Sequence, residues 1–160
     1  SLSDENLPKD YTDYYEQLLL PLLPSLEDTY PAGIVHGDLY WDNALFKDER
    51  ITALLDFEQG GLGEFIWDIG ISISGSCFDQ GMNPHFVKAF LHGYESIKKL
   101  TTAEKEAIPV AILNGFFSIA HWRIERFLYK KLDRTKVYSY RELLDRASIF
   151  FKQLESGISL

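Results

Sequence analysis

Residues 34–58 read IVHGDLYWDNALFKDERITALLDFE, and the organisation of the whole chain depends on this stretch. It contains two loops rich in polar side chains, separated by a short apolar run typical of a strand. The first loop carries His36, Asp38 and Asn43, and the second begins at Asp56. Asp and Asn are also favoured in ordinary turns, but this combination around one strand exceeds what turn formation requires. A loop that holds Asp38 and Asn43 so close in sequence can direct both side chains into one pocket.

Phosphoryl transfer is the chemistry that uses such a set of groups. A carboxylate accepts the proton of the attacking hydroxyl, while an amide oxygen and a second carboxylate hold magnesium against the nucleotide phosphates. Oxygen ligands suit magnesium because this hard cation keeps several waters and takes only a few protein groups. One catalytic acid or base and two metal ligands would therefore fit the polar positions of residues 34–58.

The composition limits the class of protein. At 160 residues the chain is long enough for one domain, 1–160, that buries about 70% of its unfolded surface. Its 46% apolar and 25% charged residues are typical of a soluble globular protein. Sixteen basic and 24 acidic side chains give a formal charge of −8, which argues against nucleic acid as a partner.

The same survey predicts a cytoplasmic protein without a membrane partner. No apolar stretch is expected to reach the length of a bilayer span, and no basic and apolar leader opens the chain. The single cysteine, Cys77, excludes an internal disulfide and suits a reducing compartment. Because Cys77 lies in an apolar run, we expect it to be a small buried hydrophobic side chain.

The remaining pattern predicts a fold that is mainly α with a small antiparallel β insert. Residues 1–10 are expected to be a linker, and the glycine-rich segment 60–63 a flexible connection. Helix starts are indicated by Asn83-Pro84 and by capping boxes that begin at Thr101 and Ser139. Helices are predicted at 11–23, 65–78, 83–97, 101–131 and 139–154, and strands at 34–35, 44–46 and 51–57.

The pattern His-x-Asp-x-x-x-x-Asn at 36–43, followed by Asp-Phe-Glu at 56–58, resembles a known family. It is similar to the catalytic and metal-binding loops of the aminoglycoside phosphotransferase and choline kinase superfamily, a branch of the protein-kinase-like fold. The resemblance implies that Asp38 is the base for the substrate hydroxyl and that Asn43 and Asp56 bind Mg²⁺. It also implies ATP as the phosphoryl donor.

Five further residues receive supporting roles. The resemblance implies that His36 braces the loop rather than reacting, and that Asp68 accepts hydrogen bonds from the catalytic-loop backbone. Glu58 either approaches the metal through water or is a surface carboxylate. Arg123 lies on an apolar helix face and needs an anionic partner, which is either an internal carboxylate, the alternative we favour, or an anionic group of the substrate. Trp41, with its neighbour Tyr40, either walls the acceptor pocket or packs against the last helices.

The acceptor is an alcohol that the shared loops do not specify. The closest resemblance is to bacterial homoserine kinases of the phosphotransferase type, through Asp38-Leu39, Asp42-Asn43, Phe46 and Cys77-Phe78. Choline, ethanolamine or aminoglycoside kinases are the alternatives within the superfamily, and a non-catalytic pseudokinase is the alternative from another class. A metallophosphoesterase is disfavoured because such sites gather two metals from several histidine-bearing loops, and this chain has 4 histidines.

A kinase of this fold also needs an N-terminal lobe with a strand lysine that pairs with the nucleotide phosphates. Only a short segment precedes the motif, and the only methionine is Met82, so we expect the chain to be the C-terminal lobe alone. The full-length protein is then expected to transfer the γ-phosphoryl group of ATP, and this fragment to be nearly inactive. The surface left by the absent lobe is expected to favour self-association.

Overall fold

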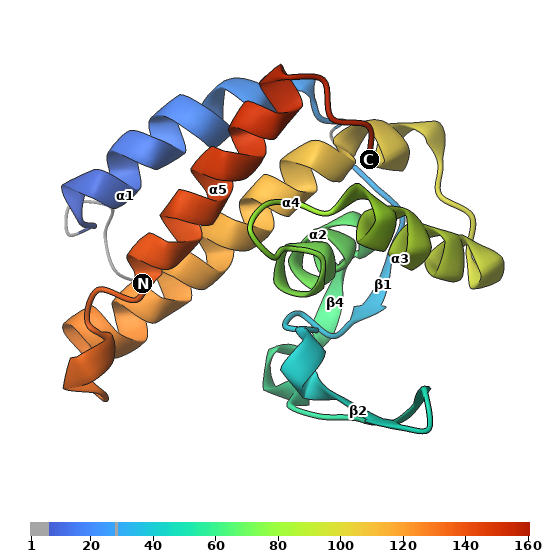
Figure 1. Ribbon diagram of the computed structural model, residues 1–160, viewed down its shortest axis with the longest axis horizontal. Helices are drawn as coiled ribbons and strands as arrows, with labels where there is room; N and C mark the ends of the chain where they lie inside the picture. Colours follow the sequence, from blue (N-terminus) through green and yellow to red (C-terminus); the bar gives the residue numbers. More distant parts are fainter. Residues whose placement is uncertain (1–6, 28) are drawn as a thin grey trace.

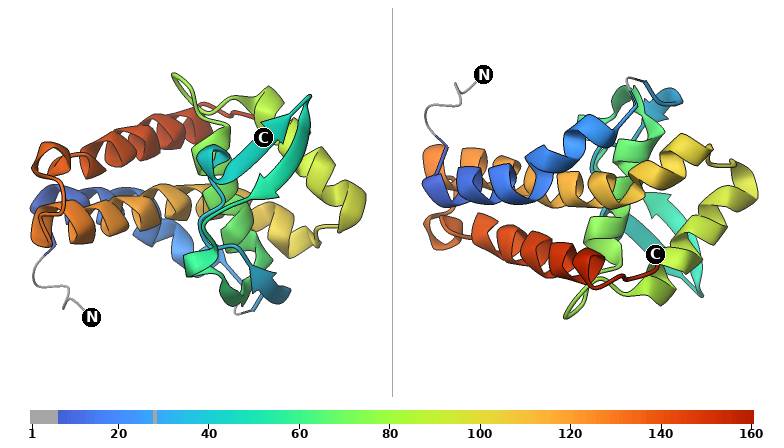
Figure 2. Two further views of the ribbon diagram at one scale, coloured as in Figure 1. Left: turned by 90° about the horizontal axis from the view of Figure 1, so that it is seen from below. Right: turned by 90° about the horizontal axis from the view of Figure 1, so that it is seen from above.

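The computed structural model describes residues 7–27 and 29–160, and helices dominate it (Figure 1). The α-helices are α1 (Lys9–Tyr14), α2 (Phe65–Ser76), α3 (Pro84–Ile97), α4 (Thr102–Arg123) and α5 (Tyr140–Glu155). Shorter helical segments are η2 (Tyr15–Leu19), η3 (Leu20–Ser25), η4 (Trp41–Asn43), η5 (Phe57–Gln59), η6 (Ile124–Tyr129) and η7 (Arg134–Lys136). Figure 2 shows α1, α4 and α5 running side by side. The predicted helix-rich class is therefore confirmed.

The first helical segment changes its winding along its length. The α-turns of α1 continue as a π-helical segment, η2, and then as a 3-10 segment, η3, so the helix predicted at 11–23 is present. Proline lacks the N–H that a helical ladder needs, and Pro24 lies inside η3. The predicted linker is wrong at its end, because Asp10 belongs to α1 and accepts a hydrogen bond from Tyr140 Oη at 2.9 Å. Residues 1–6 of that prediction lie outside the described part.

The start of α4 has the predicted capping box. Thr101 Oγ1 accepts a hydrogen bond from the Glu104 backbone N–H at 3.1 Å, and Glu104 Oε2 accepts one from the Thr101 N–H at 2.8 Å. Pro109 lies in the early turns without interrupting the 22-residue helix. By contrast, the box predicted at Ser139 is wrong, because the Ser139 side chain caps no backbone group and Glu142 reaches other side chains instead.

The long helix corrects one further expectation. The stretch Thr102–Tyr129 has 28 residues and a mean hydropathy of 1.2 in its most apolar window, which by length and composition is enough to cross a membrane. The expectation that no stretch reaches this length is therefore wrong. In the structure 61% of this window is buried inside the protein, against α2 and α5, which is the environment of a core helix.

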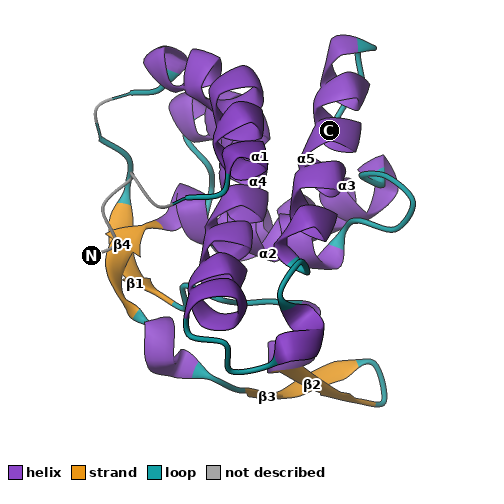
Figure 3. Ribbon diagram, turned by 90° about the vertical axis from the view of Figure 1, so that its left-hand side faces the viewer, coloured by secondary structure: helices purple, strands orange, loops and turns teal. Residues whose placement is uncertain are grey.

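Two short antiparallel sheets lie on one side of the helices (Figure 3). Strands β2 (Ala44–Lys47) and β3 (Arg50–Leu54) form the predicted hairpin, which turns at two residues with positive φ, Asp48 and Glu49. Strands β1 (Ala32–Val35) and β4 (Gly61–Glu64) form the second sheet. β3 ends before the predicted limit, because Asp56 takes the left-handed conformation with a φ of 60°.

The expectation of a flexible glycine-rich connection at 60–63 is wrong, since residues 61–63 belong to strand β4. Gly63 of β4 and Gly33 of β1 allow a close approach between the two strands and between β1 and α2. A Cβ on Gly63 would lie 3.0 Å from Val35 Cγ2, and a Cβ on its cross-strand partner Gly33 would lie 2.5 Å from the ring of Phe65. Any larger side chain at Gly33 would push against the first residue of α2.

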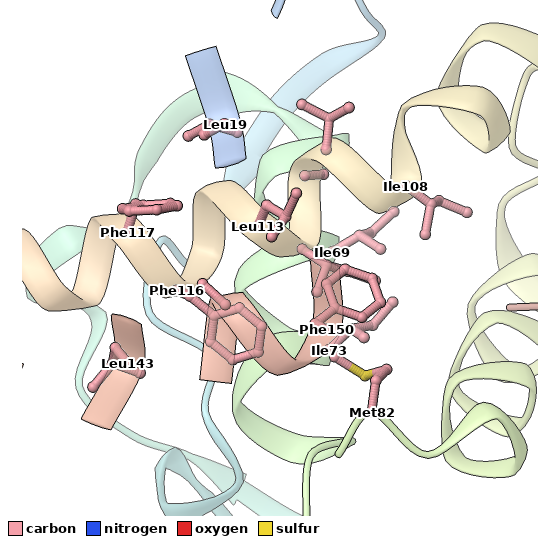
Figure 4. Close-up of a cluster of buried hydrophobic side chains, with 14 of the residues drawn as sticks. Leu19, Ile69, Ile73, Met82, Ile108, Leu113, Phe116, Phe117, Leu143 and Phe150 are labelled. Carbon is pink, nitrogen blue, oxygen red and sulfur yellow. The ribbon is translucent and has the colours of Figure 1, made fainter. Parts of the chain in front are cut away.

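The core lies where α2, α4 and α5 meet. Figure 4 shows Ile73 of α2, Phe116 of α4 and Phe150 of α5 together beside Met82, and all four are at most 2% exposed. Cys77 is also buried, and desolvation raises the pKa of its thiol to about 11, so it behaves as the expected small hydrophobic side chain. This core fixes α2 and α4, which carry the residues beneath and beside the polar loops.

Candidate active site

A cleft of about 390 Å³ lies between the two polar loops and the second half of α4. The loops contribute the oxygen-bearing side chains of Asp38, Asp42, Asn43, Asp56 and Glu58. Helix α4 contributes Ser118, Ile119, Trp122 and Arg123. Of the predicted site residues, the structure therefore brings five together in this lining, which are Asp38, Asn43, Asp56, Glu58 and Arg123, whereas His36, Asp68 and Trp41 do not line the cleft.

Asp68 fixes the backbone of the first loop. It lies in the first turn of α2, where its Oδ1 accepts a hydrogen bond from the Gly37 N–H at 2.8 Å and its Oδ2 accepts one from the His36 N–H at 3.1 Å. Gly37 itself has a φ of 80°, and a Cβ there would lie 2.6 Å from the Gln59 carbonyl oxygen. The loop therefore requires glycine at this position and a carboxylate beneath it.

His36 connects the two loops. Its ring nitrogen Nε2 lies 2.8 Å from the Leu55 carbonyl oxygen, and Nδ1 lies 3.3 Å from the Asp38 backbone nitrogen. Both contacts are satisfied only if Nε2–H donates and Nδ1 accepts, which is a tautomer of the neutral ring. The side chain is 5% exposed and packs against Phe57. These contacts hold Asp38 in a fixed place relative to the end of β3.

Asn43 is oriented by the residue that it faces. Its Nδ2 donates a hydrogen bond to the Asp38 carbonyl oxygen at 2.8 Å, and since a carbonyl can only accept, the amide nitrogen must point toward it. The amide oxygen is then directed away from this contact and can act as an oxygen ligand. Asp56 directly precedes the 3-10 turn η5 in a left-handed conformation, its side chain makes no capping hydrogen bond, and Glu58 lies within that turn.

The cleft carries an excess of negative charge. Desolvation raises the pKa of the Asp38 carboxyl above its usual value, and the charges of Asp56 and Asp42 raise it further. Glu58 adds an effect in the same direction. A cation bound among these groups would relieve this repulsion. An amide oxygen beside clustered carboxylates is also a donor set that suits a hard, hydrated cation such as Mg²⁺.

The metal would have few protein ligands. Within residues 7–27 and 29–160, no three His, Cys, Asp or Glu side chains form a cluster that could hold a metal ion by themselves. Magnesium does not need such a cluster, because it keeps most of its waters and takes one or two carboxylates. Asn43 and Asp56 fit that pattern.

Arg123 makes the internal ion pair that we favoured. Its Nη1 donates to the Ser139 carbonyl oxygen at 2.8 Å and to Glu142 Oε2 at 2.9 Å. Arg123 also lines the cleft, so it lies where the alternative partner, an anionic group of the substrate, would bind.

The aromatic wall differs from the expected one. Trp41 is 67% exposed, whereas Tyr40 lines the cleft and covers Gly75, where a Cβ would lie 2.4 Å from the Tyr40 ring. Desolvation raises the pKa of the Tyr40 hydroxyl to about 12, which keeps it uncharged. Trp122, which the sequence analysis did not select, is the second aromatic residue of the wall. The sequence signal for Trp122 was its position four residues after Ser118, which places both side chains on the same face of the helix.

Solved structures show which fold the chain has. A microcompartment-associated aminopropanol kinase matches with a TM-score of 0.70 at 18% identity, over 95% of this chain and 47% of the kinase. An amicoumacin kinase in complex with AMP-PNP and Ca²⁺ matches with a TM-score of 0.60 at 24% identity, over 92% and 49% of the two chains. These similarities show a kinase-like fold.

The family follows from the sequence. Residues 2–107 match the description "Phosphotransferase enzyme family", and the chain belongs to that family, as the resemblance implied. A homoserine kinase of Beijerinckia indica subsp. indica is 35% identical over 100 residues, which are 61% of this chain and 31% of the relative. A homoserine kinase of Granulibacter bethesdensis is 39% identical over 82 residues, 50% of this chain and 26% of the relative. The chain therefore spans about a third or less of these curated relatives.

Proposed function

We propose that the whole protein containing this chain transfers the γ-phosphoryl group of ATP to the hydroxyl of a small molecule, with homoserine as the acceptor. The observation that carries this proposal is the meeting of Asp38, Asn43 and Asp56 in one negatively charged cleft. Membership of the phosphotransferase family and the similarity to two homoserine kinases support it.

Asp38 is the proposed base. It lies half-buried at the cleft, fixed by the backbone contacts of its neighbours His36 and Gly37 to Asp68. A carboxyl with a raised pKa holds a transferred proton more firmly than an ordinary one, which favours removal of the proton from the acceptor hydroxyl. Magnesium, when bound by Asn43 and Asp56, would neutralise the charge of the nucleotide phosphates. The protein residues themselves position the acceptor and receive its proton.

We further propose that this chain is the helical, C-terminal lobe of the enzyme. The chain matches about half of the solved aminopropanol kinase, and its described strands form only two-stranded sheets. We assign the lysine-bearing, nucleotide-covering lobe to another part of the whole protein. Ile34 and Leu62, which face each other across β1 and β4, are 85% and 89% exposed and mark the surface for such a lobe. Alone, this surface would favour self-association.

We propose a cytoplasmic location, because ATP and Mg²⁺ are available there and the buried thiol of Cys77 would stay reduced. The acceptor is tested by a screen of the whole protein with ATP and Mg²⁺ against homoserine, choline, ethanolamine and an aminoglycoside. We expect the highest kcat/KM for homoserine. Nucleotide binding without transfer to any acceptor would contradict the proposal and support a non-catalytic binding module.

A further inference from the structure

The two walls of the cleft have opposite charges. The loop wall carries Asp38, Asp42, Asp56 and Glu58, whereas Arg123 on α4 is the one cationic side chain lining the cleft in the described part of the protein. Two of the four acids have roles in the proposed function, Asp38 as base and Asp56 as metal ligand, and Glu58 lies in the turn that follows Asp56. Asp42 and Arg123 remain as oppositely charged groups without an assigned partner from a substrate.

Arg123 keeps part of its hydrogen-bonding capacity for a ligand. A guanidinium has five N–H donors, and both donors of Nη1 are used by Ser139 and Glu142. Within residues 7–27 and 29–160, no acceptor is bound to Nε or Nη2 of Arg123. These two nitrogens form the edge that binds a carboxylate through two parallel hydrogen bonds. The contacts to α5 therefore hold Arg123 in place while leaving this edge available.

The ion pair does not neutralise the α4 wall. Glu142 accepts hydrogen bonds from Arg123 at 2.9 Å and from Arg146 at 2.5 Å, so one carboxylate is shared by two guanidinium groups. The pair of arginines and Glu142 thus retains one net positive charge. Since the Arg123 side chain is 25% exposed, this charge is only partly screened by solvent and attracts an anionic group in the cleft.

Asp42 has the complementary property. It lies in the 3-10 turn η4 next to Asn43, lines the cleft and is exposed. In the described part of the protein, its carboxylate makes no hydrogen bond and no ion pair with another side chain. A positively charged group of a ligand would therefore meet an unpaired carboxylate one residue away from a proposed metal ligand.

We propose that Asp42 and Arg123 select the acceptor as a zwitterion, with Asp42 receiving an ammonium group and Arg123 a carboxylate while the hydroxyl lies at Asp38. The substrate class is a short amino acid with a terminal hydroxyl. This inference rests on the proposed function and assigns the residues that determine its specificity. Polycationic acceptors such as aminoglycosides are disfavoured because they would place an amine against Arg123.

The test measures kcat/KM of the whole protein for three acceptors. Homoserine has both charged groups, 3-aminopropan-1-ol lacks the carboxylate, and 4-hydroxybutyrate lacks the ammonium. We expect the unmodified protein to prefer homoserine over either analogue by about 10- to 100-fold, the effect of one charged hydrogen-bonded contact. This comparison requires no substitution and therefore no assumption about folding.

Substitutions then assign the preference to residues. Arg123→Met is expected to lower kcat/KM for homoserine by about 10- to 100-fold and to change that for 3-aminopropan-1-ol by less than about threefold. Asp42→Asn is expected to lower kcat/KM for homoserine by about 10- to 100-fold and to change that for 4-hydroxybutyrate by less than about threefold. The matched control is Arg134→Met, an exposed arginine outside the cleft, which should leave the values for all three acceptors unchanged.

The outcomes separate the two levels of the proposal. Phosphorylation of none of the three acceptors would overturn the proposed function and this inference with it. Phosphorylation of homoserine with no preference over the analogues would overturn the zwitterion selection alone. An equal loss for homoserine and 3-aminopropan-1-ol in Arg123→Met would likewise contradict it and reduce Arg123 to a structural contact with α5.

Discussion

Asp68 on α2 accepts the backbone N–H of Gly37 at 2.8 Å, so the helix beneath the cleft holds the loop that carries Asp38. The second oxygen of Asp68 accepts the neighbouring N–H of His36 at 3.1 Å. Because Asp68 does not line the cleft, it acts by positioning the loop backbone rather than by touching a ligand. The stability of the loop and its chemistry can therefore be tested separately.

Asp68→Asn should lower the free energy of unfolding by about 1–3 kcal/mol. The amide keeps one acceptor oxygen, so one of the two backbone N–H groups loses its partner. Urea unfolding followed by circular dichroism measures the change, and the control is Asp145→Asn, an exposed aspartate on α5. Equal stability of the two variants would contradict the role assigned to Asp68.

Gly70→Ala should destabilise the protein by about 2 kcal/mol or more, because a Cβ on Gly70 would lie 2.2 Å from the Ala111 carbonyl oxygen where α2 crosses α4. The matched control is Gly93→Ala in α3, where a Cβ meets nothing within 4 Å. This control should stabilise the protein by about 0.5–1 kcal/mol, since alanine is a better helix former than glycine. Thermal unfolding of both variants measures these changes in stability. A change of the same sign in both variants would be inconsistent with the packing described.

Glu142→Gln should show a pH-dependent loss of stability. Desolvation opposes the effect, but the hydrogen bond from Arg123 and the charge of Arg146 lower the pKa of the Glu142 carboxyl overall. A group with a lowered pKa in the folded state stabilises the protein above its unfolded pKa and loses this contribution as the pH falls through the folded pKa. Because Glu142 is half-exposed, the loss at pH 7 should be only about 0.5–1 kcal/mol.

Thermal unfolding at pH 7 and at about pH 2.5 measures this effect, with Glu106→Gln, an exposed glutamate of α4, as the control. The stability difference between the unmodified protein and Glu142→Gln should shrink at the lower pH, because the contribution of a carboxylate with a lowered pKa is lost as the pH falls through that pKa. A difference of the same size at both pH values would show that the ion pairs of Glu142 contribute nothing.

Millimolar Mg²⁺ should raise the melting temperature of the unmodified protein, because a cation relieves the repulsion among the clustered carboxylates. The rise should be smaller in Asp56→Asn, which lacks one proposed ligand. Glu49→Gln, at the exposed hairpin turn, serves as the control and should keep the full rise. Identical shifts in all three proteins would argue against Asp56 as a metal ligand.

The elements that the sequence predicted correctly are encoded by neighbouring residues. Asn83 accepts the His85 N–H at 3.0 Å to start α3, and Thr101 and Glu104 bond each other at the start of α4. Such signals lie within four residues and do not depend on the rest of the fold. The Asp68 contact was accessible only through the family resemblance, since it joins residues about thirty positions apart.

The features that the sequence did not predict depend on distant packing. Strand β4 has glycines where a strand pattern would need branched side chains, and it exists because β1 pairs with it. Glu142 stands where a capping box would use it, yet Arg123 from another helix competes successfully for its carboxylate. The α4 wall of the cleft, with Ser118 and Trp122, likewise depends on how that helix crosses α2.

The most direct test of the central claim is Asp38→Asn in the whole protein. We predict that Mg²⁺-dependent transfer from ATP to homoserine, measured as phosphohomoserine formed, falls by about 100-fold or more while the circular dichroism spectrum is unchanged, because the amide cannot accept the proton of the hydroxyl. An Asp38→Asn protein that transfers phosphate at the rate of the unmodified enzyme would contradict the assignment of this cleft as the phosphotransfer site.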